Sequence, residues 1–328
     1  MLILSESDLR SLLEMREVIG AVESGFRALA RGDANVPERL RLDVPAHRGV
    51  MLLMPGYVGP VDDQRSALGT KIVSVFNQNA HCGLDLIQSV YLLLDTGTGV
   101  PLSLMGGRFI TAIRTAATSA VATKFMAAAG AKRLSSFGAG VQAQFHIEAM
   151  IEVAEVERVM IASRTTEKAR ALAERVRSVH KLPCEVVSAE RAAGEAGLIC
   201  ACTSSPDPLF EGNLLMEGTH INAVGAFTPS TRELDTRAVQ RARVIIDAET
   251  SAGREAGDIL LPISEGAIDQ DHVKGTLADV VSGKVAGRES PSEITLFKSC
   301  GHAIEDLVTA RLAYSKATAA GTGTEVGL

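Results

Sequence analysis

The fold is decided by the stretch SFGAGVQAQF, residues 136–145. An apolar run precedes it and a helical pattern follows it, which is the context of a dinucleotide-binding turn. In such a turn Gly138 permits the tight bend and Gly140 lets the backbone approach a pyrophosphate. Ala143 stands where a third glycine is common and is small enough for close helix–strand packing. We therefore interpret the stretch as a cofactor loop, although the same spacing also occurs in turns that bind nothing.

Short apolar runs alternate with helical patterns on both sides of this loop. The runs cover residues 133–138, 158–163, 184–188, 197–204, 220–227 and 243–249. Strands that read as continuous apolar runs, separated by helices, are typical of a parallel sheet covered on both faces. The sequence therefore predicts an α/β fold in which residues 119–303 form a Rossmann-type, doubly wound parallel sheet that binds NAD(P).

The N-terminal third has a different pattern. A helical pattern over residues 8–31 is followed by apolar runs joined by turn residues such as those at 96–99, which predicts an antiparallel sheet. An Ala-rich helix over 111–130 leads into the Rossmann domain. We expect the C-terminal helix to return to the first domain and the last residues, 322–328, to form a loose tail. The predicted α+β domain comprises residues 1–118 and 304–328.

Composition excludes several classes of protein. The chain has 328 residues, a formal net charge of -6 and 46% apolar residues, and its 33 Lys and Arg are scattered. We therefore expect no nucleic-acid or membrane partner. The sequence contains no apolar run of about 20 residues and no signal-peptide pattern. The five cysteines form no C-x-x-C pair and the seven histidines show no metal-ligand spacing, so we expect a cytoplasmic protein without a metal site.

The residues after the second predicted strand indicate which cofactor binds. NAD-specific sites usually place Asp or Glu there to hold the ribose 2′-hydroxyl, but this chain has Ser163, Arg164 and Thr165. Two hydroxyls and a guanidinium suit a 2′-phosphate. The sequence predicts NADPH; NADH stays open as an alternative, since Arg164 could also be a solvated loop residue.

Three basic residues of the first domain could hold and polarise a substrate. They are Arg39 in VPERLRL, Lys71 in LGTKIVSVF and Arg114 in ITAIRTAATSA. A charge in such apolar surroundings is costly unless it is paired or functional. Each residue also has a structural interpretation: Arg39 as a surface strand charge, Lys71 as half of an ion pair, and Arg114 as an interdomain clamp.

Nearly the whole chain resembles the ornithine cyclodeaminase/mu-crystallin family of NAD(P)-dependent enzymes. The resemblance is carried by VPERLRL, MPGY, GTKIVSVFNQN, LLLDTGTGVPLSLM, ITAIRTAATSAVA, FGAGVQAQFH, CTSSPDPLF, HINAVGAFTPSTRELD and ITLFKSCGHAIEDL, in this order. It implies a homodimer whose first domain forms the dimer sheet and binds substrate.

The resemblance also implies roles for individual residues. Arg39 and Arg114 would bind the substrate carboxylate, and Lys71 would be the catalytic residue that faces the reacting carbon and nitrogen. The residues implied at the cofactor, together with those found from the loop itself, are Arg114, Thr115, Gly138, Gly140, Val141, Gln142, Ser163, Arg164, Thr165, Thr203, Ser204, Asn222, Val224, Gly225 and Ser299.

One departure from the family pattern favours imine reduction over ammonia release. Cyclodeaminases and the related alanine dehydrogenase carry Asp two residues after the glycine of NAVG, where this chain has Phe227. Ammonia release would lack its acid/base group. We predict NADPH-dependent reduction of Δ1-pyrroline-2-carboxylate or Δ1-piperideine-2-carboxylate to L-proline or L-pipecolate. The alternatives are an NAD-dependent ornithine or lysine cyclodeaminase and a low-turnover NADPH-binding protein like mu-crystallin.

Further departures are expected to reshape the substrate pocket. Asp85 and Ser89 stand where the family often has Pro and Gly, and Gly106 stands where an acidic residue is usual.

Overall fold

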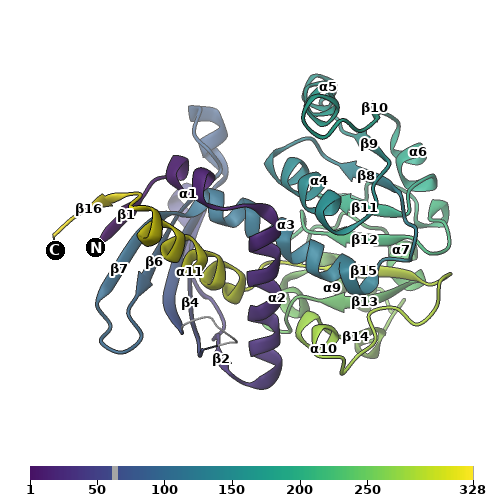
Figure 1. Ribbon diagram of the computed structural model, residues 1–328. Coiled ribbons are helices and arrows are strands. Elements are labelled where there is room, and N and C mark those ends of the chain that lie inside the picture. The colour runs from purple at the N-terminus through teal and green to yellow at the C-terminus, as the bar shows by residue number, and fades with distance from the viewer. Residues whose placement is uncertain (61–65, 328) are drawn as a thin grey trace. The chain divides into compact units, whose positions relative to one another are not determined.

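The computed structural model describes residues 1–60 and 66–327. The chain divides into two compact units, Met1–Arg114 with His302–Leu328, and Thr115–Gly301 (Figure 1). The helix α3 (Gly107–Met126) contains the first boundary. The domain limits expected from the sequence lie within a few residues of these boundaries and remain a prediction. Among the described helices, none is long and apolar enough to cross a membrane.

The second unit contains a parallel sheet. Its strands follow the order β10-β9-β8-β11-β12-β15-β13-β14, and every pairing is parallel. The bounds are β8 (Arg133–Phe137), β9 (Arg158–Ala162), β10 (Cys184–Val186), β11 (Leu198–Ala201), β12 (His220–Ala223), β13 (Ala242–Ile246), β14 (Val273–Thr276) and β15 (Ile294–Lys298). The order reverses between β8 and β11, which confirms the doubly wound topology expected from the sequence.

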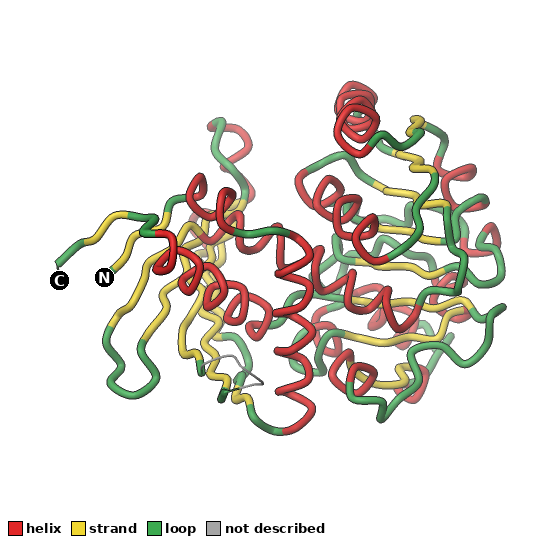
Figure 2. The backbone as a smooth tube through the Cα atoms, in the orientation of Figure 1, coloured by secondary structure: helices red, strands yellow, loops and turns green. Residues whose placement is uncertain are grey.

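Helices cover both faces of this sheet. Figure 1 shows α4 on one side and α6 on the other, and Figure 2 shows helices and strands alternating along this part of the chain. The strands β11 and β12 are buried at every residue, which explains why they read as unbroken apolar runs. The helices are α4 (Val141–Val153), α5 (Thr166–Arg175), α6 (Ala189–Gly194), α7 (Thr236–Arg241), α8 (Ala252–Glu255), α9 (Gly257–Ser264) and α10 (Leu277–Val281).

The first unit combines an eight-stranded sheet with helices, as predicted for an α+β domain. Its sheet has the order β16-β1-β7-β6-β5-β4-β2, with β3 also paired to β4. The bounds are β1 (Leu2–Leu4), α1 (Glu6–Leu12), α2 (Met15–Arg31), β2 (Ala34–Asn35), β3 (Leu40–Val44), β4 (Gly49–Val58), β5 (Ala67–Phe76), β6 (Ile87–Leu94), β7 (Pro101–Gly106), α11 (Ala303–Ala320) and β16 (Thr324–Glu325). The pairing is antiparallel except between β1 and β7, which are parallel.

Residues 322–327 do not form the loose tail expected from the sequence, and residue 328 lies outside the described residues. After α11, Gly321 and Gly323 adopt φ values of +63° and +108° and turn the chain back. The following strand β16 pairs with β1, and the backbone groups of Met1 and Val326 exchange hydrogen bonds of 2.9 and 3.0 Å. These bonds satisfy the backbone groups on the edge of β1, so the expectation of a loose tail was wrong.

The helix α11 packs against one face of the first sheet and against α2. It is buried from Ala303 to Arg311 and lies against β4, β5, β6 and α2. A Cβ built at Gly25 of α2 would lie 3.0 Å from Val308, so the glycine permits the close approach of the two helices. This packing brings the first turn of α11 to β5, although the two segments are more than 200 residues apart in sequence.

Candidate functional site

A buried lysine occupies the middle of the first sheet. Lys71 on β5 pairs with Met54 on β4 and with Tyr91 on β6, so its side chain shares a sheet face with both. The side chain is 2% exposed, and its Nζ donates a 2.7 Å hydrogen bond to Asp306 Oδ2 on α11. The sequence therefore located this lysine correctly as a buried charge but did not identify its partner.

A buried arginine joins the same group. Arg114 Nε donates to Asp306 Oδ1 at 3.0 Å, and Arg114 Nη1 donates to Glu305 Oε2 at 2.5 Å. Asp306 thus binds both Lys71 and Arg114. We call Lys71, Arg114, Glu305 and Asp306 the buried charge cluster. Its two positive and two negative charges balance, as the low polarity of a protein interior requires.

The two cations of the cluster respond differently to their surroundings. Burial, and then the positive charge of Arg114, lower the pKa of Lys71 from 10.5 to about 8, against the opposing effect of Asp306. Burial also acts to lower the pKa of Arg114, but Asp306 and Glu305 outweigh it and the pKa of Arg114 is raised. Lys71 is therefore the cation of this pair that can exchange a proton near neutral pH.

Glu305 and Asp306 are not among the residues predicted from the sequence. Both lie in the first turn of α11, where acidic residues are common because they complement the helix dipole. Their position therefore gave no signal of a further role. A signal would have required knowledge that α11 packs on β5.

The structure places Arg39 before β3. The next residue, Leu40, pairs with Leu53 on β4, and the adjacent Met54 pairs with Lys71 on β5. Arg39 therefore directly precedes β3, and β4 lies between β3 and the strand β5 that carries Lys71. Its predicted role as a carboxylate ligand stays a prediction.

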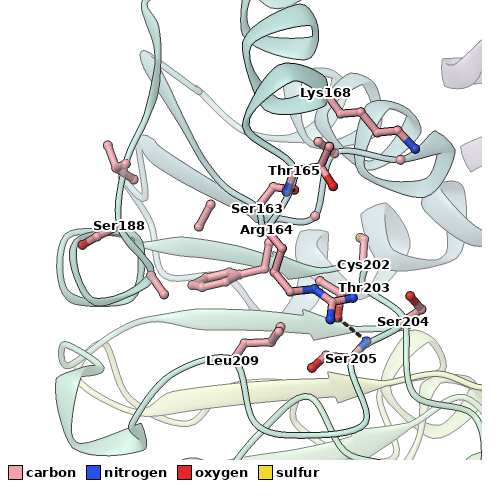
Figure 3. Close-up of a pocket in the computed structure, with 17 residues that line it drawn as sticks. Ser163, Arg164, Thr165, Lys168, Ser188, Cys202, Thr203, Ser204, Ser205 and Leu209 are labelled. Atoms are coloured by element: carbon pink, nitrogen blue, oxygen red, sulfur yellow. Dashed lines mark hydrogen bonds between the residues drawn. The ribbon is translucent and has the colours of Figure 1, made fainter.

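A cavity of about 480 Å³ lies in the second unit at the carboxyl ends of β8, β9 and β11 (Figure 3). Seven of the predicted cofactor residues line it: Gly138, Gly140, Ser163, Arg164, Thr165, Thr203 and Ser204. The sequence did not identify three polar residues that also line it: Lys168, Ser188 and Ser205. In doubly wound sheets ligands bind at this end, where the strand order reverses.

The glycine loop has the geometry that a dinucleotide requires. Gly138 adopts φ +101°, and a Cβ there would lie 2.7 Å from the carbonyl oxygen of Cys202. Around Gly140 no atom lies within 4 Å of a built Cβ, so the backbone faces open space at the start of α4. These features fit a pyrophosphate at the N-terminus of α4.

Two cations, Arg164 and Lys168, line the cavity, and no described residue of its lining is acidic. Figure 3 shows the Arg164 side chain extending toward Thr203 and Ser205, with Lys168 projecting in another direction. Lys168 lies in the first turn of α5, where the helix dipole disfavours a cation. That unfavourable placement was the signal in the sequence for a functional lysine.

The other predicted cofactor residues lie outside the lining of this cavity. Asn222 on β12 donates its amide to Thr123 Oγ1 at 3.0 Å, and its buried Oδ1 has no partner in the described parts of the chain. Ser299 donates to Asp247 Oδ2 at 2.9 Å at the end of β15. The complete set outside the lining is Arg114, Thr115, Val141, Gln142, Asn222, Val224, Gly225 and Ser299, and their contact with the cofactor stays a prediction.

Asp85 belongs to an ion-pair group near the surface, and Gly106 lies next to this group. Arg108 Nε donates to Glu6 Oε1 at 3.0 Å, and Arg108 also pairs with Asp85. A Cβ at Gly106 would lie 2.8 Å from Glu6 Cγ, so glycine makes room for Glu6. At this place the acidic group comes from α1, and an effect on the substrate pocket remains a prediction.

The departure at residue 89 lies on the same sheet face as Lys71. Ser89 pairs with Val73, two residues from Lys71. Its buried Oγ has no partner among the described residues, and a Cβ at Gly107 would lie 2.6 Å from it. The serine hydroxyl thus packs tightly against the start of α3.

Phe227 lies in the loop after β12 and is exposed. The neighbouring Ala226 carbonyl accepts a 2.5 Å hydrogen bond from the buried Lys298 Nζ. No carboxylate stands at residue 226, 227 or 228.

The chain is similar to known proteins over its full length. A model of the ornithine cyclodeaminase/mu-crystallin family matches residues 1–321. A Delta(1)-pyrroline-2-carboxylate reductase of Bacillus cereus is 36% identical, and the match covers 99% of each chain.

Two solved structures are similar to both units. The structure of Thermococcus litoralis Delta(1)-pyrroline-2-carboxylate reductase with NADH and L-proline has a TM-score of 0.95 and 41% identity, and the match covers 99% of this chain and 100% of that one. An archaeal alanine dehydrogenase dimer with bound NAD has a TM-score of 0.93 and 30% identity, and the match covers 100% of this chain and 99% of that one.

Proposed function

The chain belongs to the ornithine cyclodeaminase/mu-crystallin family, and from this premise we propose that it reduces a cyclic imine bearing a carboxylate. The substrate class is Δ1-pyrroline-2-carboxylate or Δ1-piperideine-2-carboxylate, the product is L-proline or L-pipecolate, and NAD(P)H is the reductant. Two relatives named Delta(1)-pyrroline-2-carboxylate reductase, at 36% and 41% identity, support the proposal.

The balanced charge of the buried cluster is the observation that carries this proposal. A protonated cyclic imine with a carboxylate is a zwitterion without net charge, so it adds no net charge to a buried group that is already neutral. Ornithine and lysine carry a net positive charge, which would require a further carboxylate. Phe227 stands where a cyclodeaminase would supply one. The structure therefore favours the imine.

We assign the steps to residues of the first unit. Arg39 and Arg114 bind the substrate carboxylate through charge-assisted hydrogen bonds. Lys71 faces the imine and holds the proton that keeps its nitrogen positive, because the lowered pKa of Lys71 permits proton exchange near neutral pH. Asp306 fixes the ammonium group of Lys71 through the 2.7 Å bond.

The cofactor binds in the cavity of the second unit. Its chemical contribution is a hydride for the imine carbon. The Gly138–Gly140 turn holds the pyrophosphate, and Thr203 and Ser204 also line the cavity. We further propose a preference for NADPH, since Arg164 and Lys168 both line the cavity and suit a 2′-phosphate.

Replacement of Lys71 tests the proposed reaction. We expect the wild type to oxidise NADPH in the presence of either cyclic imino acid. Lys71→Ala should lower kcat by about a hundredfold or more, because proton transfer contributes on that order, while NADPH binding, measured by fluorescence titration, stays within about threefold. Equal turnover in wild type and variant would remove Lys71 from the mechanism.

The pH profile supplies the control for this experiment. Below about pH 8 Lys71 is protonated, so kcat/KM of the wild type should be constant there and fall as the pH rises above that value. Lys71→Arg keeps the positive charge at every pH but cannot release a proton, so it should be slow and lack this alkaline decline. Persistence of the same decline in Lys71→Arg would assign it to another group.

Cofactor preference is tested at the positive end of the cavity. Arg164→Ala and Lys168→Ala should each weaken NADPH binding by about tenfold or more, since each removes a charge-assisted bond, and should leave NADH binding nearly unchanged. The control is Arg170→Ala, because Arg170 is exposed on α5, the helix that carries Lys168, and does not line the cavity. An equal loss for both cofactors, or a wild type that prefers NADH, would contradict the proposed preference.

We also propose that the protein is a homodimer assembled through the first sheet. Leu40, Leu53, Ile72 and Val90 are successive partners across β3, β4, β5 and β6, on the face opposite Lys71. On this face Leu40 and Leu42 are 58% and 50% exposed. An open apolar sheet face of this kind is typical of an interface, and the related alanine dehydrogenase is a dimer.

Light scattering after gel filtration tests the dimer. The wild type should have about twice the chain mass of 34.5 kDa, and Val90→Arg should yield monomer because it places a charge on the apolar face. Val179→Arg is the matched control, since Val179 is an exposed valine of the second unit. A monomeric wild type would contradict the proposal, as would a Val90→Arg dimer.

We propose that the protein is located in the cytoplasm. All five cysteines are free thiols, which suits a reducing compartment.

A further inference from the structure

We propose that Glu233 is a positioning residue that holds the loops after β11 and β12 together, and that this prepares the cofactor cavity before the cofactor binds. The inference rests on the cofactor binding described above and assigns a role to a residue that neither the motif nor the cavity lining identified.

One buried carboxylate spans the two loops. Glu233 Oε1 accepts hydrogen bonds from the backbone N and the Oγ1 of Thr203, both at 2.7 Å. Its other oxygen, Oε2, accepts from the backbone N of Gly225 at 2.7 Å. Thr203 follows β11 and Gly225 follows β12, and these strands are neighbours in the parallel sheet. Each loop is therefore held by a different oxygen of the same side chain.

One of the two held loops, the loop after β11, forms part of the cavity wall. Thr203 Oγ1 accepts a 3.1 Å hydrogen bond from Ser205 N, so Glu233 fixes the turn that contains Thr203, Ser204 and Ser205. Figure 3 shows all three residues at the cavity. On the other loop, a Cβ at Gly225 would overlap the Thr203 carbonyl oxygen, so only glycine permits the two loops to meet.

The backbone of Glu233 is itself held by a buried ion pair. Asp258 Oδ1 accepts from the backbone N atoms of Glu233 and Leu234 at 2.7 and 2.9 Å, and Asp258 Oδ2 pairs with Lys298 Nζ at 2.8 Å. Lys298 Nζ also donates to the Ala226 carbonyl, one residue after Gly225. Glu233, Asp258 and Lys298 are all fully buried.

This arrangement buries two carboxylates against one lysine. Burying charge is unfavourable, so the second carboxylate depends on the backbone amides and the Thr203 hydroxyl that bond these side chains. Those amides belong to loop residues, which would otherwise be mobile. Fixing them in advance removes an entropic cost from cofactor binding. A purely structural role would stabilise the fold without changing cofactor affinity, and this difference can be measured.

The variant Glu233→Gln distinguishes a role in preparing the cofactor cavity from a purely structural role. A carboxamide has one acceptor oxygen and one donor nitrogen, so either Thr203 N–H or Gly225 N–H must then face another donor. We expect the dissociation constant for NADPH to rise at least tenfold, which corresponds to about 1.4 kcal/mol. Turnover at saturating cofactor should stay within about threefold of wild type. Hydrogen exchange should increase in residues 203–205 and 224–226.

The matched control is Asp235→Asn. Asp235 also accepts from two backbone N atoms, those of Gly212 and Ala238, at 2.9 and 2.7 Å, and it does not line the cavity. Its replacement should lower the melting temperature without changing NADPH affinity. Unchanged NADPH affinity in Glu233→Gln, or an equal loss of affinity in both variants, would overturn the proposal.

A second variant covers the case in which Glu233→Gln does not fold. Thr203→Val keeps the size of the side chain and removes one of the three bonds to Glu233. Hydrogen exchange at 224–226, in the other loop, should then increase, and unchanged exchange there would overturn the coupling.

Because NADPH binding is measured without an imine, these results are independent of the proposed reaction. A wild type that fails to reduce cyclic imines would contradict the reaction and leave this test intact.

Discussion

The first unit depends on one interaction, the double pairing of Asp306 with Lys71 and Arg114. These three side chains come from α11, β5 and α3. Without Asp306, Lys71 would lose the buried carboxylate that bonds it, and Arg114 would keep only Glu305. With Glu305 they form a neutral group that α11 closes when it packs on the sheet. The same neutrality determines which ligands suit this group. A zwitterion preserves the charge balance, whereas a diamino acid with a net positive charge disturbs it.

Buried carboxylates perform a related task in the second unit. Glu233 holds the loops after β11 and β12, and Asp247 holds residues 299–301 after β15 by accepting from Ser299 Oγ and from the backbone of Cys300 and Gly301. These three loops follow strands of one parallel sheet, at the end where doubly wound folds bind ligands. In both units, fully or nearly fully buried acidic side chains therefore fix the segments that we propose to bind substrate and cofactor. The backbone and cationic groups that donate hydrogen bonds to these acids make their burial tolerable.

Most features that depend on residues close together in the chain could be predicted from the sequence, whereas contacts between residues far apart in the chain could not. The Rossmann pattern, the tight turn at Gly138 and the burial of Lys71 all follow from residues close together in the chain. Asp306 lies 235 residues from Lys71, and its place in a helical first turn already had an ordinary explanation. The pairing of β16 with β1 also joins the two ends of the chain, so a terminal segment rich in Gly and Thr was misread as loose. Lys168 is an exception: its sequence context did indicate a function, because a cation is unfavourable at a helix N-terminus, but it was not among the predicted residues.

We propose that the neutral cluster accepts a cyclic imine and that the product forms by hydride addition to the imine carbon. Isotope transfer tests this proposal most directly. NADPH labelled with deuterium at the transferred position of the nicotinamide is incubated with the protein and either cyclic imino acid, and the product is analysed by mass spectrometry and NMR. The account predicts one deuterium at the carbon bearing the carboxylate of L-proline or L-pipecolate, and no ammonia from ornithine with NAD. Unlabelled product, or ammonia release from ornithine without imine reduction, would contradict it.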